Sequence, residues 1–325
     1  MTVLSFFQGI LGIAVLLGIA WAFSNNRRRV NWKLVGTGLS LQAVFGILVI
    51  KGETLALYFS PLGWVKVAFG FIAEGFVVVL GFTTEGARFI FGNLALAPGT
   101  TDSLGFYFAF QVLPTIIFFS CLMSVLYHLG IMQKVVQGMA WVMARLMGTS
   151  GAESLSNTAN IFVGQTEAPL MIRPFIAGMT QSELLTIMTG GMATIAGGVM
   201  AAYVQMLGFS YAKVHDLPIT EAQIQFAAQL LGASIMAAPA SLLVSKIIFP
   251  EVEEPLTKGT VKVNVEKTSS NVIEAAAAGA ADGLQLALNV GAMLLAFIAL
   301  IALLNYTLEG IGEWVGLNPV LREQF

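Results

Sequence analysis

Long apolar runs separated by short polar segments dominate this chain. A helix that crosses a membrane needs about 20 largely apolar residues. Runs of this kind cover 3–23, 35–50 (a short one), 106–128, 224–249 and 272–308. A sixth run, 181–207, is interrupted near its middle by the sequence TGGMATIAGG. The pattern predicts an all-α polytopic membrane protein with one broken helix.

The region 53–100 is apolar but is punctuated by proline and by charged residues. These are Pro61, Lys66, Glu74, Glu85 and Arg88. Their spacing leaves no charge-free span, so we predict one or two helices that lie along the membrane interface or pack obliquely.

The last apolar run, 272–308, is too long for a perpendicular crossing, because a helix rises about 1.5 Å per residue. We expect it to be strongly tilted, or kinked near Gly279, Gly283 or Gly291. Asp282 and Glu274, near its start, are expected to be solvated or paired.

Composition gives the same class of protein. The 325 residues are 57% hydrophobic and 10% charged, whereas a soluble domain is about 25% charged. The net charge of −2 gives no indication of nucleic-acid binding. A lone cysteine, Cys121, excludes a disulfide framework or a thiolate metal site. The first apolar run lacks a preceding basic region and a small-residue cleavage site, so we predict a retained helix and not a signal peptide.

The basic residues predict the orientation in the membrane. Lys and Arg are retained on the cytoplasmic side, and the loop SNNRRRVNWK carries four of them. Placing this loop inside puts the N-terminus outside. It also places 129–180 and the polar linker 250–271 inside, provided that 129–180 enters and leaves the membrane on one face.

The segment 150–180 has the pattern of a helical hairpin that stops part-way through the membrane. A helix from Ser150 to Val163 would be about 21 Å long, too short to span. Gly164 permits a turn, and Pro169 suits the first turn of a second helix. The predicted tip is the polar run GQTE, which in a membrane must face protein or a water-filled cavity.

The interruption TGGMATIAGG provides a partner for this tip. Gly190-Gly191 and Gly197-Gly198 flank Thr194, a composition that lets a helix unwind and release carbonyl oxygens. Small hard cations prefer oxygen ligands, and carbonyls at helix breaks bind sodium in secondary transporters. Asn160 and Thr194 are the candidate side-chain ligands.

The tip residues suit a neutral polar ligand such as a nucleobase. Glu167 precedes Pro169, where the positive end of a helix dipole favours a carboxylate, and Gln165 and Thr166 add groups that donate and accept. Purely structural interpretations stay open: GQTEAP could be a cytoplasmic loop, Asn160 could make an interhelical hydrogen bond, and the glycines could form a close-packing face.

Several segments together resemble one known family. The sequences NIFVGQTEAPLMIRP and MTQSELLTIMTGGMATIAGGVMAAY resemble the bacterial sodium-coupled members of the concentrative nucleoside transporter family, and the likeness extends over essentially 1–325. The resemblance implies a homotrimer in the bacterial cytoplasmic membrane, built from eight transmembrane helices and two re-entrant hairpins per protomer. It also implies inverted repeats, elevator-type movement, and no cofactor besides sodium as the coupling ion.

The resemblance also implies the roles of individual residues. The substrate-binding residues would be Gln165, Thr166, Glu167, Val199 and Leu286. The sodium ligands would be Asn160, the carbonyl of Val163, and Thr194 with the carbonyl of Ile195. Relatives most often have serine where this chain has Thr194, and the hydroxyl is retained.

In the family, a second hairpin and a further helix that bind the ribose follow the long tilted helix, so we expect residues 1–325 alone not to transport. The predicted parts are N-terminal helices with the interfacial region (1–105), a first repeat (106–249), the cytoplasmic linker and 272–325, which begins a second repeat. Within the first repeat lie the re-entrant hairpin (about 136–178) and the broken helix (about 181–207).

The function predicted is sodium-coupled symport of nucleosides such as uridine. A proton-coupled transporter of the same family is the alternative, although Asn160 and the hydroxyl of Thr194 favour sodium. An intramembrane enzyme is disfavoured because no HExxH motif or convincing catalytic pair is present. A structural scaffold would leave the polar tip unexplained.

Overall fold

The computed structural model describes residues 3–57, 60–98, 100–165, 167–258 and 269–315. These residues are helical, apart from turns, loops and an isolated β-bridge between Ser150 and Lys258. The longer helices are α1 (Val3–Ala22), α2 (Trp32–Ala56), α3 (Gly63–Phe91), α5 (Leu113–His128), α6 (Ile131–Met147), α9 (Gln181–Ala193), α10 (Gly197–His215), α11 (Ile219–Ile248) and α12 (Val272–Val315). The shorter ones are α4 (Phe108–Gln111), α7 (Gly151–Ala159), α8 (Arg173–Ile176) and the 3-10 helices η1 (Arg27–Arg29), η2 (Ser60–Leu62), η3 (Gly92–Ala95) and η4 (Ala168–Ile172).

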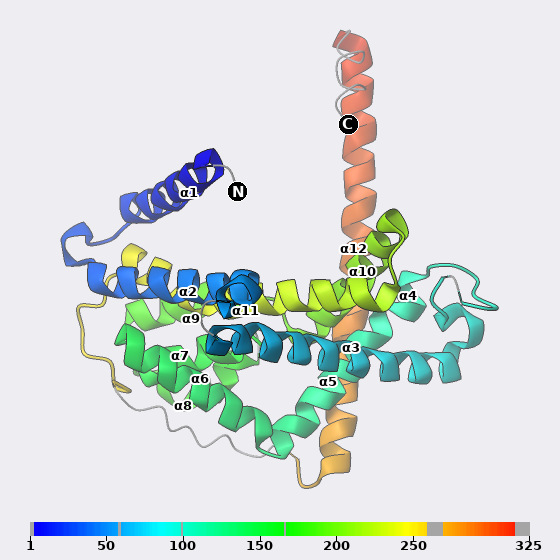
Figure 1. Cartoon of the computed structure of the whole chain (residues 1–325), viewed down its shortest axis with the longest axis horizontal. Coiled ribbons are helices and arrows are strands. Elements are labelled where there is room, and N and C mark those ends of the chain that lie inside the picture. The colour runs from blue at the N-terminus through cyan, green and yellow to red at the C-terminus, as the bar shows by residue number, and fades with distance from the viewer. Residues whose placement is uncertain (1–2, 58–59, 99, 166, 259–268, 316–325) are drawn as a thin grey trace.

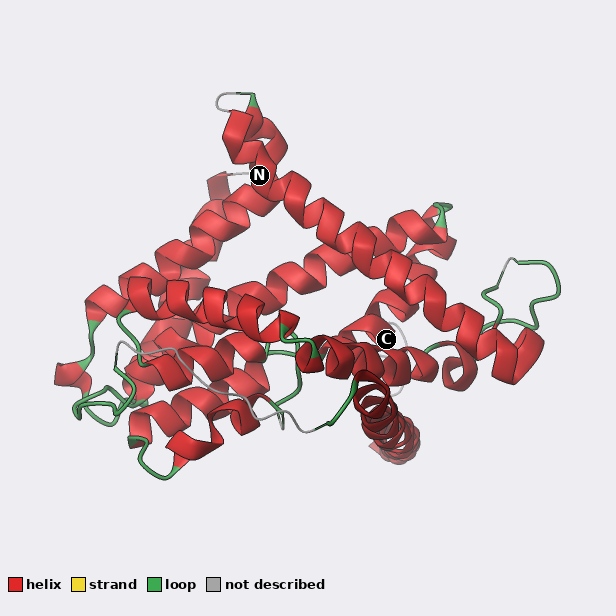
Figure 2. Ribbon diagram, turned by 90° about the horizontal axis from the view of Figure 1, so that it is seen from below, coloured by secondary structure: helices red, strands yellow, loops and turns green. Residues whose placement is uncertain are grey.

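Six helical segments of the described chain are long and apolar enough to cross a membrane. The predicted all-α polytopic fold is therefore confirmed. In Figure 1, α12 runs steeply across α2, α3 and α11, which lie roughly along one direction. Seen from below in Figure 2, the long helix near the C label is foreshortened, because α12 runs at a steep angle to the other long helices. Helix α11 contacts α2, α3, α9 and α10, and so lies at the centre of the bundle.

Most of the region 53–100 is one long helix, α3, with the end of α2 and η2 before it and η3 after it. Apart from Gly63 at its start, the buried residues of α3 form a single stripe: Phe69, Ala73, Val77, Leu80, Thr83 and Ala87. The charged residues Glu74, Glu85 and Arg88 lie on exposed positions instead. By length and composition Gly63–Ala95 could also cross a membrane, so the interfacial position of α3 stays a prediction.

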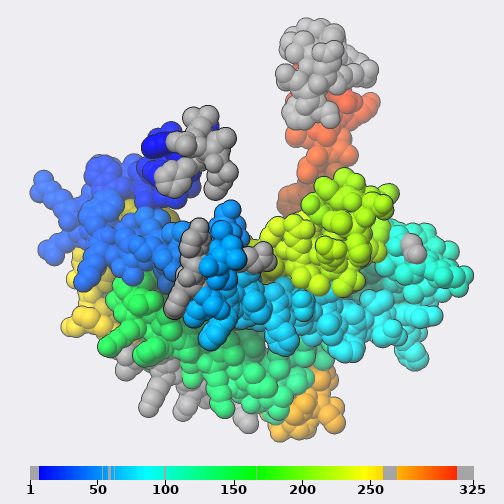
Figure 3. Space-filling model, in the orientation of Figure 1, coloured from blue at the N-terminus to red at the C-terminus, as the bar shows by residue number. Residues whose placement is uncertain are grey.

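Helix α12 is continuous from Val272 to Val315, with no break at its glycines. A Cβ atom at Gly279 would lie 2.5 Å from Cβ of Ser124, and one at Gly283 would lie 2.8 Å from Cα of Ile117. The glycines therefore allow close approach of α5, and of the two predicted alternatives the kink is wrong. The later part of α12 stands clear of the other helices (Figure 3), and many of its large apolar side chains are exposed.

Loops that the sequence predicts to be cytoplasmic gather at one end of the fold. The backbone N–H of Asn25, in the arginine-rich loop, donates to the carbonyl of Ile248 at the end of α11 (2.8 Å). The N–H of Gly151 donates to the carbonyl of Thr257 (2.9 Å). The Thr180 hydroxyl, after the second arm of the hairpin, donates to Glu251 in the same linker (2.8 Å). The hairpin therefore begins and ends at the same end of the fold, as a re-entrant segment requires.

Candidate functional site

The first arm of the hairpin is α7, and all nine of its residues are buried. It begins with a capping box, in which the Ser150 side chain accepts from the N–H of Glu153 and the Glu153 carboxylate accepts from the N–H of Ser150. It ends at Ala159, with Asn160 as the C-cap. The predicted helix to Val163 is thus too long by four residues, because the chain turns as soon as it leaves the cap.

The second arm consists of η4 and α8, and η4 packs against α7. Pro169 lies in the first turn of η4, as predicted, but the turn is a 3-10 helix. The predicted bounds 136–178 also include much of α6, which Gly148 separates from the hairpin by a left-handed turn (φ 70°).

The tip lies between the arms and is closed by Glu167. Its N–H donates to the carbonyl of Gly164 (3.1 Å), and its carboxylate accepts from the N–H of Gly164 (3.1 Å). Gln165 is exposed. Thr166, the third predicted tip residue, lies outside the described residues.

The predicted helix break is confirmed. Helix α9 ends at Ala193, Thr194 is extended (φ −126°, ψ 164°), and α10 begins at Gly197. The Thr194 hydroxyl donates to the carbonyls of Asn160 (3.0 Å) and Gly190 (3.3 Å). The N–H of Gly197 donates to the carbonyl of Phe162 (3.0 Å). The hairpin tip and the helix break are therefore in direct contact.

Asn160 is the most unusual residue at this contact. Its side chain is 1% exposed, yet neither Nδ2 nor Oδ1 has a hydrogen-bond partner among the described residues. A buried polar group without a partner costs about 1–3 kcal/mol. The bland alternative, an interhelical hydrogen bond from this side chain, is thus not what the described residues show. An amide oxygen beside the C-terminal ends of α7 and α9 suits a cation, because helix C-termini are negative.

The glycines around the break have a packing role as well. A Cβ atom at Gly190 would lie 1.6 Å from Oδ1 of Asn157, and one at Gly197 would lie 2.7 Å from the carbonyl oxygen of Phe162. A Cβ atom at Gly191 would lie 3.0 Å from Cβ of Gln165. The close-packing interpretation is therefore correct, and it coexists with the helix break.

A cleft of about 770 Å³ opens beside the tip. Of the predicted site residues it is lined by Val163, Glu167 and Leu286. Gln165 and Val199 do not line it; Gln165 lies near Gly191, and Val199 is half-buried in the first turn of α10. Gly164 of the tip and residues 196–198 at the helix break also line the cleft, and with Val163 and Glu167 they form one wall of it.

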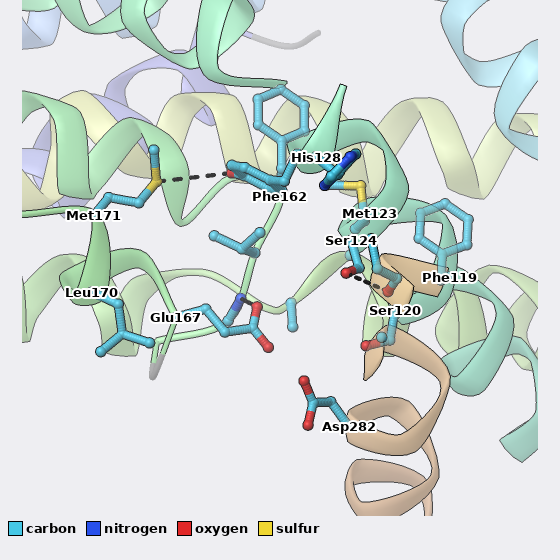
Figure 4. A pocket seen from close by; sticks show the side chains of 18 of the residues that line it. Phe119, Ser120, Met123, Ser124, His128, Phe162, Glu167, Leu170, Met171 and Asp282 are labelled. Atoms are coloured by element: carbon cyan, nitrogen blue, oxygen red, sulfur yellow. Dashed lines mark hydrogen bonds between the residues drawn. The ribbon is translucent and has the colours of Figure 1, made fainter. Parts of the chain in front are cut away.

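The opposite wall of the cleft comes from α5 and α12 and contains polar residues that the sequence does not assign to the site. Figure 4 shows Ser120 and Ser124 of α5 and Asp282 of α12, with the Asp282 carboxylate directed toward the space beside Glu167. Asp282 was expected to be solvated or paired; it is exposed and also lines the cleft. The signal for it is helical spacing, since Gly279, Asp282 and Leu286 share one face of α12.

Secondary transporters bind their substrates where discontinuous segments meet, and this chain has such a meeting point inside a bundle of membrane-length helices. Its class is therefore that of a multi-pass membrane transporter. Three family models match it: "Na+ dependent nucleoside transporter N-terminus" over residues 11–94, "Nucleoside recognition" over 109–210, and "Na+ dependent nucleoside transporter C-terminus" over 229–323.

The chain is 45% identical over 313 residues to an uncharacterized transporter of Haemophilus influenzae, covering 96% of this chain and 68% of that protein. It is 42% identical over 308 residues to sodium/nucleoside cotransporter 2 of Rattus norvegicus, covering 94% of this chain but only 41% of that protein. The structure of CNTnw in an inward-facing substrate-bound state matches with a TM-score of 0.77 and 38% identity, over 96% of this chain and 67% of that one.

The chain belongs to the Na+-dependent concentrative nucleoside transporter family. This is a family of transporters and not of enzymes. The chain is a multi-pass membrane protein, and its relatives include proteins of the bacteria Haemophilus influenzae and Bacillus subtilis. The chain spans about two thirds of the Haemophilus protein and less than half of the rat cotransporter.

Proposed function

We propose that the protein containing this chain is a sodium-coupled symporter that imports nucleosides such as uridine across the bacterial cytoplasmic membrane. Membership of a Na+-dependent nucleoside transporter family supports the substrate class. The observation that carries the proposal is the side chain of Asn160, buried and unpartnered among the described residues, where the hairpin tip meets the helix break. We further propose that it works as a homotrimer by elevator-type movement.

The proposed sodium ligands are the side chains of Asn160 and Thr194 and the carbonyls of Val163 and Ile195. Their support is the contact between tip and break, where Thr194 already donates to the Asn160 carbonyl. Amide, hydroxyl and carbonyl oxygens are the ligand types that hard cations prefer. No cofactor is proposed beyond this coupling ion.

The proposed nucleobase contacts are Gln165, Thr166 and Glu167, with Val199 and Leu286 as apolar contacts. Glu167 and Leu286 line the cleft, which supports their role. Gln165, in the tip, and Val199, in the first turn of α10, lie outside the cleft lining. Their contact with a base therefore requires both the tip and the start of α10 to shift when the ligand binds.

Coupling follows from this arrangement. Sodium bound between tip and break would neutralise the carbonyl dipoles of both elements and fix the tip in one position. A fixed tip presents Glu167 to the base, so ion and nucleoside each bind more tightly when the other is present. This reciprocity is a requirement of linkage between binding sites.

The test is uptake of labelled uridine by proteoliposomes that contain the natural gene product, with and without an imposed sodium gradient. Asn160→Ala is expected to raise the sodium concentration for half-maximal uptake about ten-fold, the equivalent of about 1.4 kcal/mol. Asn289→Ala, an exposed asparagine on α12, is the matched control. An unchanged sodium curve for Asn160→Ala would remove the ion assignment.

Proton coupling is the second candidate, and one observation favours it: the carboxylates of Glu167 and Asp282 face the same cleft (Figure 4). Uptake measured in sodium-free buffer over a range of pH separates the two. Uptake driven by an inward proton gradient alone would replace sodium symport with proton symport.

A further inference from the structure

A buried lysine connects three helices at the end of the hairpin opposite its tip. Nζ of Lys246, in α11, lies 2.8 Å from Oε2 of Glu153 in α7 and 3.0 Å from Oε2 of Glu251 in the linker. It also donates to Oγ of Ser182 in α9 (3.0 Å). We call these four residues, Glu153, Ser182, Lys246 and Glu251, the base clamp.

The base clamp is shielded from solvent. The side chains of Lys246 and Glu153 are 5% and 1% exposed, and that of Glu251 is 22% exposed. Exposed ion pairs contribute little to stability, but a buried charge requires its partner, and removing one partner leaves the other uncompensated. The positions of Lys246, Glu153 and Glu251 are therefore coupled, because moving one of them would leave a buried charge without its partner.

The clamp lies where α7 and α9 both begin. Each helix starts with a capping box, Ser150 with Glu153 in α7 and Thr180 with Glu183 in α9. The Thr180 hydroxyl also donates to Glu251 (2.8 Å), which ties the start of α9 to the same carboxylate that pairs with Lys246. The two helices therefore share one anchored origin.

The same two helices end at the candidate ion site. Helix α7 has nine residues and is followed by Asn160; α9 has 13 residues and is followed by Thr194. At about 1.5 Å per residue the shorter helix, α7, is about 13 Å long. A change of about 5° in the angle between α7 and α9 would move their far ends apart by about 1 Å, whereas metal–ligand distances tolerate deviations of about 0.2 Å.

We propose that Lys246 is a positioning residue for the coupling ion: by joining the origins of α7 and α9 it sets the distance between Asn160 and Thr194 at their far ends. Lys246 itself does not touch ion or nucleoside. The inference rests on the proposed sodium symport and adds to it the residue that determines how well the ion site is formed.

The test uses the full protein in proteoliposomes, with the sodium concentration for half-maximal uridine uptake as the readout. Lys246→Met is expected to raise that concentration at least five-fold. The control is Lys258→Met, which removes a lysine paired with Glu254 from the same end of the fold, where both side chains are exposed. The control is expected to stay within two-fold of the unaltered protein.

Two further variants separate positioning from folding, since Lys246→Met leaves Glu153 buried without its partner. The double variant Lys246→Met with Glu153→Gln removes the unpaired charge, so it should restore the amount of folded protein while the raised half-saturating sodium concentration persists. Ser182→Ala removes a hydrogen bond from Lys246 to α9 without changing any charge, and a two- to three-fold rise is expected.

The outcomes are distinct. Sodium-driven uptake by the unaltered protein, with normal sodium curves for the double variant and for Ser182→Ala, would overturn the inference and leave the proposed function standing. If the double variant does not accumulate, Ser182→Ala decides alone. Absence of sodium stimulation in the unaltered protein would overturn the proposed function and, with it, the inference.

Discussion

Gly190 is the position where the smallest change should disturb the site most. A Cβ atom there would lie 1.6 Å from Oδ1 and 2.7 Å from Cγ of Asn157, so Gly190→Ala must displace that side chain. Asn157 is 1% exposed, accepts from the Ser241 hydroxyl (3.0 Å) and donates to the carbonyl of Glu153 (3.2 Å). Its displacement breaks contacts between α7, α9 and α11 together.

The magnitude follows from two terms. Leaving a buried polar group without its partner costs about 1–3 kcal/mol, and overpacking a tight contact costs about 1–3 kcal/mol. We expect Gly190→Ala to lose about 2–4 kcal/mol of stability, seen as an apparent melting temperature in detergent that is lower by roughly 4–8 °C. Gly75→Ala is the matched control, because no described atom lies within 4 Å of its added Cβ.

A double-mutant cycle sharpens this test. Asn157→Ala makes room for the added methyl group, so the double variant Gly190→Ala with Asn157→Ala should be clearly more stable than the sum of the two single losses predicts. Additive losses would refute the steric argument. So would a Gly190→Ala protein that melts at the temperature of Gly75→Ala.

Two further predictions concern the cleft and its walls. Glu167→Gln keeps the shape of the side chain and removes its charge. It should reduce uridine uptake at sub-saturating substrate about ten-fold, because losing a hydrogen bond to a charged group costs ~1.5 kcal/mol. Glu254→Gln, in the exposed ion pair with Lys258, is the control, and normal uptake by Glu167→Gln would exclude its contact with the base. Gly279→Ala should lower the apparent melting temperature by a few degrees, because its Cβ would lie 2.5 Å from Cβ of Ser124. Gly310→Ala in the same helix has open space and should not; equal melting of these two variants would argue against tight packing of α5 on α12.

Much of the fold follows from local sequence pattern. The length of each apolar run predicts the membrane helices, because a helix that crosses a bilayer needs about 20 largely apolar residues in one continuous segment. The same holds for the break at Thr194, because paired glycines on both sides weaken the helix wherever it packs. The predicted alternative of a kink near Gly279, Gly283 or Gly291 is wrong, because a glycine that allows close helix contact looks the same in sequence as one that bends a helix.

The tertiary structure alone decided which polar groups meet. Asp282 reaches the cleft and Lys246 connects the first turns of α7 and α9 because helices distant in sequence pack side by side. Helical spacing puts Gly279, Asp282 and Leu286 on one face of α12, but the sequence does not show what that face meets. The same is true of Asn160: the sequence identifies it as polar and buried in an apolar segment, but only the packing of α7 against α9 shows that no described residue satisfies its amide. Composition and the length of apolar runs determine which segments enter the membrane. The relative positions of the helix ends, which only tertiary packing fixes, determine where an ion can bind.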